Sequence, residues 1–314
     1  MRRLLPLALA AAAFPLHAED HGTDALRSVP SAGTRLVLQA IPPFVERLFV
    51  PVMPETSNAF SVATQKIEAV LEAPAGFALD LHNGDLSITA PPGEAAGYAR
   101  ILLGGRELTL TLVNLIPSDR VQNGVLEGYQ LGEYREPMKG LASYEKPLGF
   151  MRLSEANADL WVADHYRMRD FQCKLDGGSK FLILRPEALL KLELLQHELA
   201  ARGIAFDRFT IMSGYRTPYY NARIGNETSY SRHLYGDAMD IFIDQNADGR
   251  MDDLNHDGRI DSGDARVLQS IAAGLDESPQ WSWLKGGAGV YHANAAHGPY
   301  VHVDARGFVA RWGV

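Results

Sequence analysis

Two histidines and one aspartate in the second half of the chain are the residue types of a catalytic metal site. Six residues separate His233 from Asp240, and His302 follows much later in the chain. Two imidazoles and one carboxylate give a zinc ion three ligands and leave its fourth tetrahedral position to a water that zinc activates near neutral pH. One histidine alone is more often a surface or core residue. The set of three predicts hydrolysis at a zinc ion.

The residues around these three form an ordered series of short motifs. In chain order they are Ser213-Gly-Tyr-Arg-Thr-Pro218, Asn221, Ser231-x-His233-x-x-Gly236-x-Ala238-x-Asp240-Ile241, Val301-His302-Val-Asp304-x-Arg306-Gly307 and Arg311-Trp312. With this series, residues 164–314 resemble the M15 peptidase family, which contains D-Ala-D-Ala carboxypeptidases and peptidoglycan endopeptidases with a hedgehog-like zinc fold. The segment from His165 to Phe171, with Cys173, resembles the element that opens many such domains.

The resemblance implies roles for individual residues. His233, Asp240 and His302 would be the zinc ligands. Arg216 would hold the substrate carbonyl or carboxylate, because a guanidinium forms two parallel charge-assisted hydrogen bonds. Ser213 and Tyr215 of the same motif are predicted to bind substrate. The implied substrates are the stem peptides of peptidoglycan.

The position three residues before the last ligand departs from the family pattern. Many members have an acid there as general base, whereas this chain has Pro299, which cannot accept a proton. Two candidate bases remain: Asp304, on the same face of an extended segment as His302, and His297. Asp304 has an alternative role, because a carboxylate at this spacing orients a ligand imidazole or anchors Arg306. The identity of the base stays open.

The acidic stretch 244–264 has the pattern of calcium-binding loops. It contains seven Asp and two Asn against two Arg. Residues from 253 onward match a twelve-residue calcium loop with a glycine at its sharp turn, and an overlapping second loop starts at 244. The predicted calcium ligands are Asp244, Asn246, Asp248, Asp252, Asp253, Asn255, Asp257, Arg259, Asp261 and Asp264. The alternative is a solvated acidic turn. If calcium binds here, we expect it to stiffen the strand that carries Asp240.

The elements that must position these residues can be predicted from periodicity and end signals. A helix is expected over 186–202, a strand over 209–212 that delivers Ser213 and Arg216 to the cleft, a strand over 240–244 and a helix from 264 to about 275. The glycine-rich segment 286–290 is predicted as a turn before a final hairpin. The first helix should bury one stripe of apolar side chains, Ala188, Leu192, Leu195 and Leu199.

The first half of the chain is predicted to be rich in β-strands. Two pairs of alternating segments flank Asn83-Gly84 and Gly104-Gly105, which are strong hairpin signals. We therefore expect a small sandwich-like module over 33–132, a linker over 133–160 and the zinc peptidase domain over 161–314. The expected fold class is α+β.

The start of the chain predicts export. Residues 1–18 have a basic beginning, a short apolar run and a small-residue cleavage site that ends at Ala18, so the protein is expected to be periplasmic or secreted. No later apolar run of about eighteen residues predicts a membrane anchor. Cys173 has no second cysteine with which to pair. The net charge of −8 argues against nucleic acid as a partner. The oligomeric state is not determined.

These observations favour an exported zinc metallopeptidase of the D-Ala-D-Ala carboxypeptidase or endopeptidase type. A non-catalytic cell-wall-binding module with a structural zinc site is the alternative, and Pro299 makes it credible. A calcium-dependent adhesive protein would explain the acidic stretch but would leave His233, Asp240 and His302 without a role.

Overall fold

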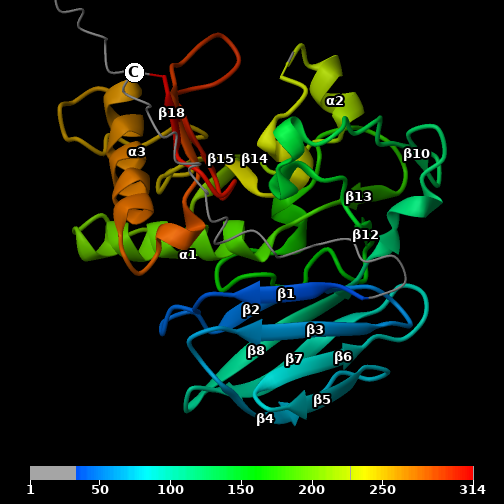
Figure 1. Cartoon of the computed structure of the whole chain (residues 1–314). Helices are drawn as coiled ribbons and strands as arrows, with labels where there is room; N and C mark the ends of the chain where they lie inside the picture. The colour runs from blue at the N-terminus through cyan, green and yellow to red at the C-terminus, as the bar shows by residue number, and fades with distance from the viewer. Residues whose placement is uncertain (1–32, 227, 314) are drawn as a thin grey trace, which may run out of the picture.

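Eight strands between residues 35 and 114 form two mixed four-stranded sheets that share one buried apolar core (Figure 1). The computed structural model describes residues 33–226 and 228–313. The strand order of the first sheet is β1 (Arg35–Leu38), β3 (Ser57–Val62), β6 (Asp85–Thr89) and β5 (Ala78–His82). The order of the second is β2 (Arg47–Val52), β8 (Arg106–Asn114), β7 (Ala96–Leu103) and β4 (Ile67–Glu72). We call these two sheets the sandwich.

Both predicted hairpins are present in the sandwich. Asn83-Gly84 joins β5 to β6, and Gly104-Gly105 joins β7 to β8. All four turn residues have positive φ, between 55° and 96°. Two successive residues of positive φ make the turn whose twist matches that of the flanking strands, which explains why Asn and Gly occupy it.

A five-stranded sheet and three helices form the second part of the structure, which we call the C-terminal domain. The strand order is β14 (Thr210–Ser213), β15 (Ala238–Phe242), β17 (Tyr300–Asp304), β16 (Gly287–Tyr291) and β18 (Ala310–Trp312). The helices are α1 (Pro186–Ala201), α2 (Pro218–Arg223) and α3 (Ser262–Glu277). Helix α3 packs on β16 and β17, and α1 packs on α3. The mixed sheets with few helices confirm the α+β class.

The predicted elements of the C-terminal domain differ from the observed ones in several places. Strand β14 begins and ends one residue later than predicted, and α3 extends about two residues further at each end. Helix α1 is present as predicted, and Ala188, Leu192, Leu195 and Leu199 are buried. The burial is not confined to one stripe, because every residue from Pro186 to Gln196 is buried between the sandwich, α3 and the rest of the domain. Strand β15 begins and ends two residues earlier than expected, because the chain leaves it at the start of the acidic stretch. The predicted turn over 286–290 is wrong: residues 287–291 form β16, in the interior of the sheet. A Cβ on Gly289 would collide with the ring of Trp312, so the glycine allows close packing here.

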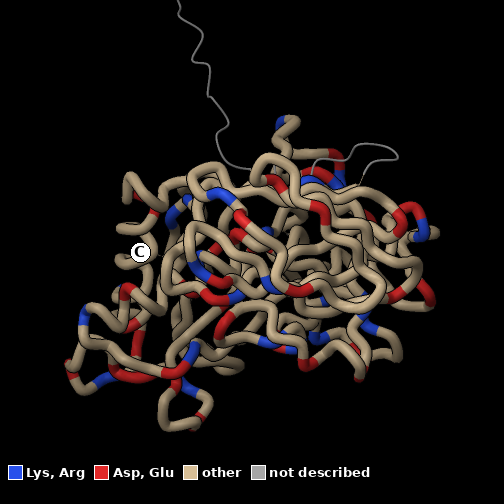
Figure 2. Tube along the Cα trace, turned by 90° about the horizontal axis from the view of Figure 1, so that it is seen from below, with Lys and Arg blue, Asp and Glu red and all other residues tan. Residues whose placement is uncertain are grey.

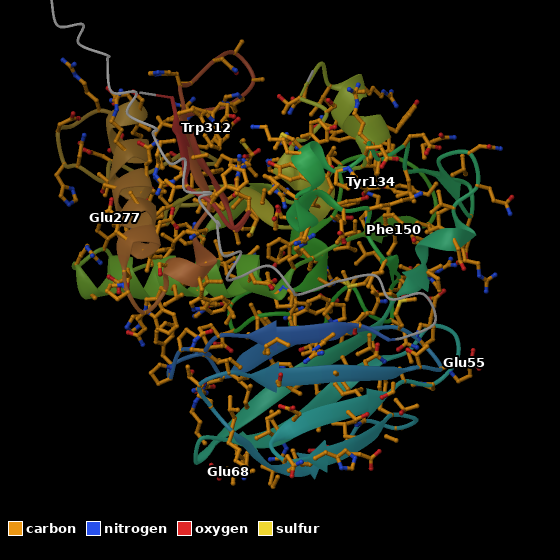
Figure 3. All side chains as sticks on the ribbon, in the orientation of Figure 1. Glu55, Glu68, Tyr134, Phe150, Glu277 and Trp312 are labelled. Atoms are coloured by element: carbon orange, nitrogen blue, oxygen red, sulfur yellow. The ribbon has the colours of Figure 1, made fainter. Side chains whose placement is uncertain are left out.

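The segment between the sandwich and the C-terminal domain is only partly irregular. It contains a three-stranded sheet, a two-stranded one and short 3-10 helices. The bounds are β9 (Ile116–Pro117), η2 (Ser118–Arg120), β10 (Val125–Leu126), β11 (Tyr129–Gln130), η3 (Met138–Gly140), η4 (Ala142–Tyr144), β12 (Gly149–Leu153), η5 (Met168–Phe171) and β13 (Lys180–Leu182). Apolar side chains of η3 and η4 pack against η6 (Arg232–Tyr235), which carries His233 and, like η7 (Ser282–Leu284), belongs to the C-terminal domain. The ring centroids of Tyr134 and Phe150, labelled in Figure 3, lie 6.2 Å apart.

The sandwich packs against the C-terminal domain along α1 (Figure 1). Trp161 donates its backbone N–H to the Tyr98 hydroxyl at 3.0 Å and accepts from Thr111 at 2.7 Å. The Phe44 ring stacks on His197 with centroids 3.9 Å apart. Burial raises the pKa of Asp164, which accepts from the Glu46 backbone, to about 6. Apolar and polar contacts therefore join the two parts.

Charged residues of both signs are interspersed along the chain (Figure 2). Several exposed ion pairs follow from this, among them Arg100 with Glu72 and with Glu107. Such exposed pairs contribute little to stability, typically about 0–1 kcal/mol each. Among the helices of the described residues, none has the length and apolar character needed to cross a bilayer. The predicted signal segment lies outside the described residues.

Candidate metal centre

The register of the C-terminal sheet places two predicted ligands directly opposite each other. Asp240 on β15 pairs with His302 on β17, and Ser213 on β14 pairs with Asp240. Because side chains alternate between the faces of a strand, the neighbours Ile241 and Val301 point to the apolar core. One row across the sheet therefore presents the carboxylate and the imidazole on the face away from that core.

His233 reaches the same point from η6, which ends at Gly236. Gly236 has a φ of 72°, and a Cβ there would collide with the backbone of Ile183. Only glycine adopts this left-handed conformation without strain at so close an approach. The chain reverses at Gly236 and enters β15, which brings His233 next to Asp240 although six residues separate them.

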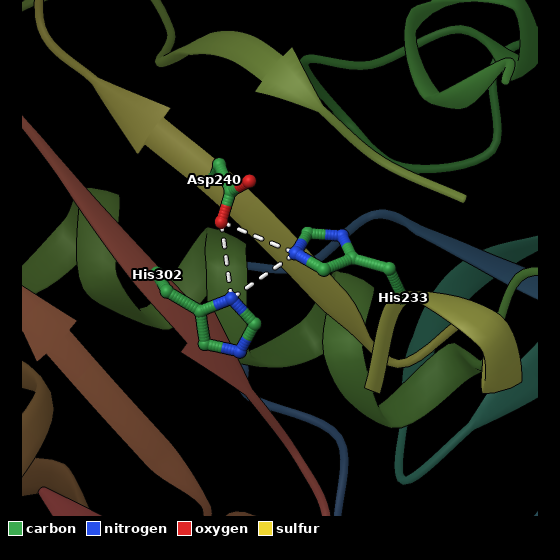
Figure 4. Close-up of side chains that lie close together, drawn as sticks. All are labelled: His233, Asp240 and His302. Carbon is green, nitrogen blue, oxygen red and sulfur yellow. Dashed lines mark hydrogen bonds and ion pairs between the residues drawn. The ribbon is translucent and has the colours of Figure 1, made fainter. Parts of the chain in front are cut away.

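The three ligand atoms form a nearly equilateral triangle (Figure 4). Asp240 Oδ1 lies 3.2 Å from His233 Nε2 and 3.0 Å from His302 Nδ1, and the two nitrogens are 3.1 Å apart. In a tetrahedral site with metal–ligand distances of roughly 2.0–2.1 Å, ligand atoms are about 3.3 Å apart. The donor set and its spacing therefore fit one small divalent metal ion.

Each imidazole is oriented by a hydrogen bond from its other nitrogen. His233 Nδ1 donates to the Gly214 carbonyl at 2.7 Å, and His302 Nε2 donates to Asp304 Oδ2 at 3.0 Å. These partners fix the proton on the nitrogen that faces away from the centre, so that the facing nitrogen keeps its lone pair. The two histidines thus present ligand atoms of different types, Nε2 from His233 and Nδ1 from His302.

Burial and mutual charge shift the ionisation of the three groups. Burial lowers the pKa of His233. Burial would raise the pKa of the Asp240 carboxyl, but the two histidines together hold it well below its ordinary value. Burial also opposes the charged form of His302, yet the carboxylates of Asp240 and Asp304 raise its pKa. The centre therefore keeps its carboxylate ionised, and a proton competes with a metal ion mainly at His302.

A cavity of about 440 Å³ opens beside the three ligands. Arg216, Tyr300 and Trp312 are among its lining residues. Burial raises the pKa of the Tyr300 phenol, and the Asp240 carboxylate raises it further. All lining residues belong to the C-terminal domain, and the sandwich edge marked by Glu68 lies far from Trp312 (Figure 3). In the described chain, the cavity is thus built without the sandwich.

Residues 158–262 match the family model described as Peptidase M15. This part of the chain is an M15 peptidase domain. The match covers about one third of the chain and includes His233 and Asp240, but it ends before His302. The third residue of the cluster joins the other two through the pairing of β15 with β17. No curated protein and no solved structure gave a significant match, so the hedgehog-like fold stays a prediction.

The predicted substrate residues of the M15 domain have different surroundings. Arg216 lines the cavity, donates from Nε to Ser213 Oγ at 2.8 Å and forms an ion pair through Nη2 with Asp240. Ser213 therefore contacts Arg216. Tyr215 is buried, and its hydroxyl bonds to that of Tyr134 at 3.0 Å. It does not line the cavity, so substrate contact by Tyr215 stays a prediction without structural support.

The two candidate bases, Asp304 and His297, also differ in their burial and hydrogen bonds. Asp304 is buried and accepts from His302, from the Gly287 backbone at 2.8 Å and from Arg306 Nε at 2.9 Å. His302 and Arg306 outweigh burial and hold the pKa of Asp304 well below its ordinary value. These contacts fit the orienting role. His297 bonds to Asn294 and to the Gly298 carbonyl, both at 2.8 Å, and is not a lining residue. Neither assignment as base has been tested.

The sequence reasoning missed Arg232, which lies next to a ligand. Its buried guanidinium forms an ion pair with Asp237, donates to the Ser143 carbonyl at 2.8 Å and lies over the rings of both Tyr144 and Tyr235. These contacts fix η6 to the segment before the C-terminal domain. The available signal was an arginine that directly precedes His233 in a region rich in tyrosine.

The acidic stretch folds into two similar turns. Asp244 accepts from the backbone N–H groups of Asp248 and Gly249, and Asp253 accepts in the same way from Asp257 and Gly258. Asp264, at the last loop position, is buried and accepts from three backbone N–H groups. Among the described residues, only His233, Asp240 and His302 form a group of three or more His, Cys, Asp or Glu side chains close enough to hold one metal ion. Calcium binding at the predicted ligands therefore stays a prediction.

Proposed function

We propose that this protein is an exported zinc metallopeptidase that hydrolyses peptide bonds in peptidoglycan stem peptides. The observation that supports it most is the convergence of His233, Asp240 and His302 at tetrahedral spacing beside a cavity. The M15 match supports the peptidase class. Zinc, rather than another metal, is proposed because two imidazoles and one carboxylate are a common catalytic zinc set. The proposed export depends on the signal-like residues 1–18.

The zinc ion, when bound, would supply a Lewis-acid centre and lower the pKa of a water to about 7. The protein's own residues hold and orient the reactants. The Gly214 carbonyl and Asp304 fix the two imidazoles, which limits the reorganisation that binding costs. Arg216 presents a guanidinium to the cavity and is positioned to bind the terminal carboxylate of a carboxypeptidase substrate or the scissile carbonyl of an endopeptidase substrate.

Analysis of muropeptides would test the proposal. Purified protein, with its zinc content verified by elemental analysis, is incubated with muropeptides of defined stem length, and the products are identified by mass spectrometry. Loss of a terminal D-alanine indicates a carboxypeptidase, and cleavage inside the stem or cross-link indicates an endopeptidase. Failure of the zinc-loaded protein to cleave any of these bonds would contradict the proposed function.

One observation favours a second candidate, a non-catalytic cell-wall-binding module with a structural metal site. Among the described residues that line the cavity, Asp240 is the only one with a carboxylate, and Asp240 belongs to the ligand cluster. The described part of the cavity wall therefore offers no carboxylate outside the ligand cluster to act as general base. Retention of zinc and binding of intact muropeptides without cleavage would support this candidate over the peptidase.

A further inference from the structure

Tyr300 occupies a place in the cavity that no predicted role explains. It lies on β17 two residues before His302, so both side chains project from the same face of the strand. It lines the cavity together with Arg216 and Asp240. Although the residue as a whole is buried, its hydroxyl forms no hydrogen bond with any residue of the described ranges and is not enclosed by protein atoms. A phenol is therefore open to the cavity beside the metal ligands.

The ring of Tyr300 is held on two sides. It stacks on Tyr291, its cross-strand partner, with centroids 4.6 Å apart and planes within 5°. The His297 ring packs against it in a T-shaped arrangement, with centroids 4.9 Å apart. Tyr291 is in turn fixed by Trp312, whose Nε1 donates to the Tyr291 hydroxyl at 3.1 Å. Aromatic contacts of these two kinds are each favourable by about 0.5–1.5 kcal/mol, so they favour the position in which the Tyr300 hydroxyl faces the cavity.

Two arginines that line the cavity, Arg216 and Arg306, are partly engaged within the protein. Arg216 uses Nε for Ser213 and Nη2 for Asp240, and Arg306 uses Nε and Nη2 for Asp304. The Tyr300 hydroxyl is a neutral donor with no such partner. During hydrolysis of an amide, the carbonyl oxygen gains negative charge, and a preset donor aimed at that oxygen stabilises the transition state more than the ground state.

We propose that Tyr300 is a catalytic residue whose hydroxyl donates a hydrogen bond to the scissile carbonyl oxygen. This inference rests on the proposed peptidase function and adds a donor from β17 to the arginine that follows β14. The hydrogen bond involves no net proton transfer. It also gives the row of side chains on β17 a division of tasks, in which His302 binds metal, Asp304 orients His302, and Tyr300 contacts substrate.

The test is Tyr300→Phe, which keeps the stacked ring and removes only the hydroxyl. We expect kcat on the cleaved muropeptide to fall about 10²–10³-fold, with KM changed by less than roughly threefold and zinc content unchanged. A phosphinate analogue of the cleaved dipeptide, which carries the tetrahedral oxygen, should bind at least about tenfold more weakly to the variant. A control variant, Tyr219→Phe, removes an exposed phenol outside the cavity and should behave as the wild type.

The outcomes separate this inference from the proposed function. If the zinc-loaded wild type cleaves no muropeptide, the peptidase function fails. If the wild type cleaves and Tyr300→Phe has a near-native kcat, only the role of Tyr300 is wrong. A second variant with 4-aminophenylalanine at position 300 keeps the ring and an N–H donor, so it also covers the case in which the Phe variant does not fold. Recovery of kcat to within roughly tenfold of wild type supports the donor role, and a folded, zinc-bound but inactive protein contradicts it.

Discussion

The centre at His233 and the acidic stretch 244–264 were both predicted as metal sites, but they differ in burial and in how the chain assembles them. The three ligands of the centre come from η6, β15 and β17, and their exposed fractions are at most 5%. The acidic stretch is local in sequence, and most of its carboxylates are exposed or half-buried. Its Asp side chains accept from backbone N–H groups of their own turns. The comparison shows that long-range strand pairing preforms the candidate metal site, whereas spacing within a loop preforms only the turn.

Substitution of one ligand should have the largest effect. His233→Ala removes one of three protein ligands, and we expect zinc to fall from about one ion per chain to near zero, together with activity. Elemental analysis and the muropeptide assay check this. His82→Ala, an exposed histidine of the sandwich, is the control and should keep both. Stoichiometric zinc in His233→Ala would remove this residue from the ligand set.

Asp304→Asn separates the two roles considered for Asp304. If Asp304 orients His302, the zinc affinity should fall about 10–100-fold, while kcat at full metal occupancy stays near the native value. If Asp304 is the base, kcat should fall about 10²–10⁴-fold at full occupancy. Metal titration and single-substrate kinetics distinguish these results, with the thermal midpoint as a check on folding, because Arg306 loses its ionic partner. His297→Gln is the matched variant for the other candidate base and should leave the zinc affinity unchanged.

The pH dependence of zinc binding and that of metal-free folding should have opposite signs at His302. Asp240 and Asp304 outweigh burial and raise the pKa of His302, so zinc binding should weaken as the pH falls through that raised value, which lies above the usual 6.5. In the metal-free protein the sign is opposite. The protonated imidazole stabilises the fold fully below about 6.5, and this stabilisation is lost as the pH rises through the raised pKa. Zinc titrations and urea unfolding between pH 5 and 8 measure both trends. A zinc affinity independent of pH in this range would contradict the assignment.

Calcium should have the smallest effect. If the acidic stretch binds it, calcium at about 100 times its Kd should stabilise the protein by about 2.7 kcal/mol, and Asp253→Asn should reduce this gain. Because the stretch begins shortly after Asp240, removal of calcium by EGTA from zinc-loaded protein is expected to lower turnover. Calorimetry and kinetics test the two effects separately. Unchanged turnover after verified removal of calcium would refute the coupling to the zinc site, even if calcium binds.

Local patterns were predicted well. The two hairpins of the sandwich have turn residues that adopt positive φ, and helix α1 begins at the proline that the sequence indicated. These features are set by the conformational preferences of a few neighbouring residues. That α1 is buried on every side, and not along one stripe, was not predicted. Strand β16 was missed, because its glycines resemble a turn in isolation. Glycine is needed in β16 because Trp312 and Asp304, from distant segments of the chain, pack directly over the strand.

The sequence by itself determined which residue types could bind a metal ion and which short motifs surround them. It could not determine that His302 offers Nδ1 while His233 offers Nε2, that Asp304 is enclosed by His302 and Arg306, or that Tyr300 opens to the cavity. These properties depend on the register of β15 with β17 and of β16 with β17, and register decides which side chains share a face. Residue identity sets the available chemistry, and strand pairing sets the geometry in which it is used.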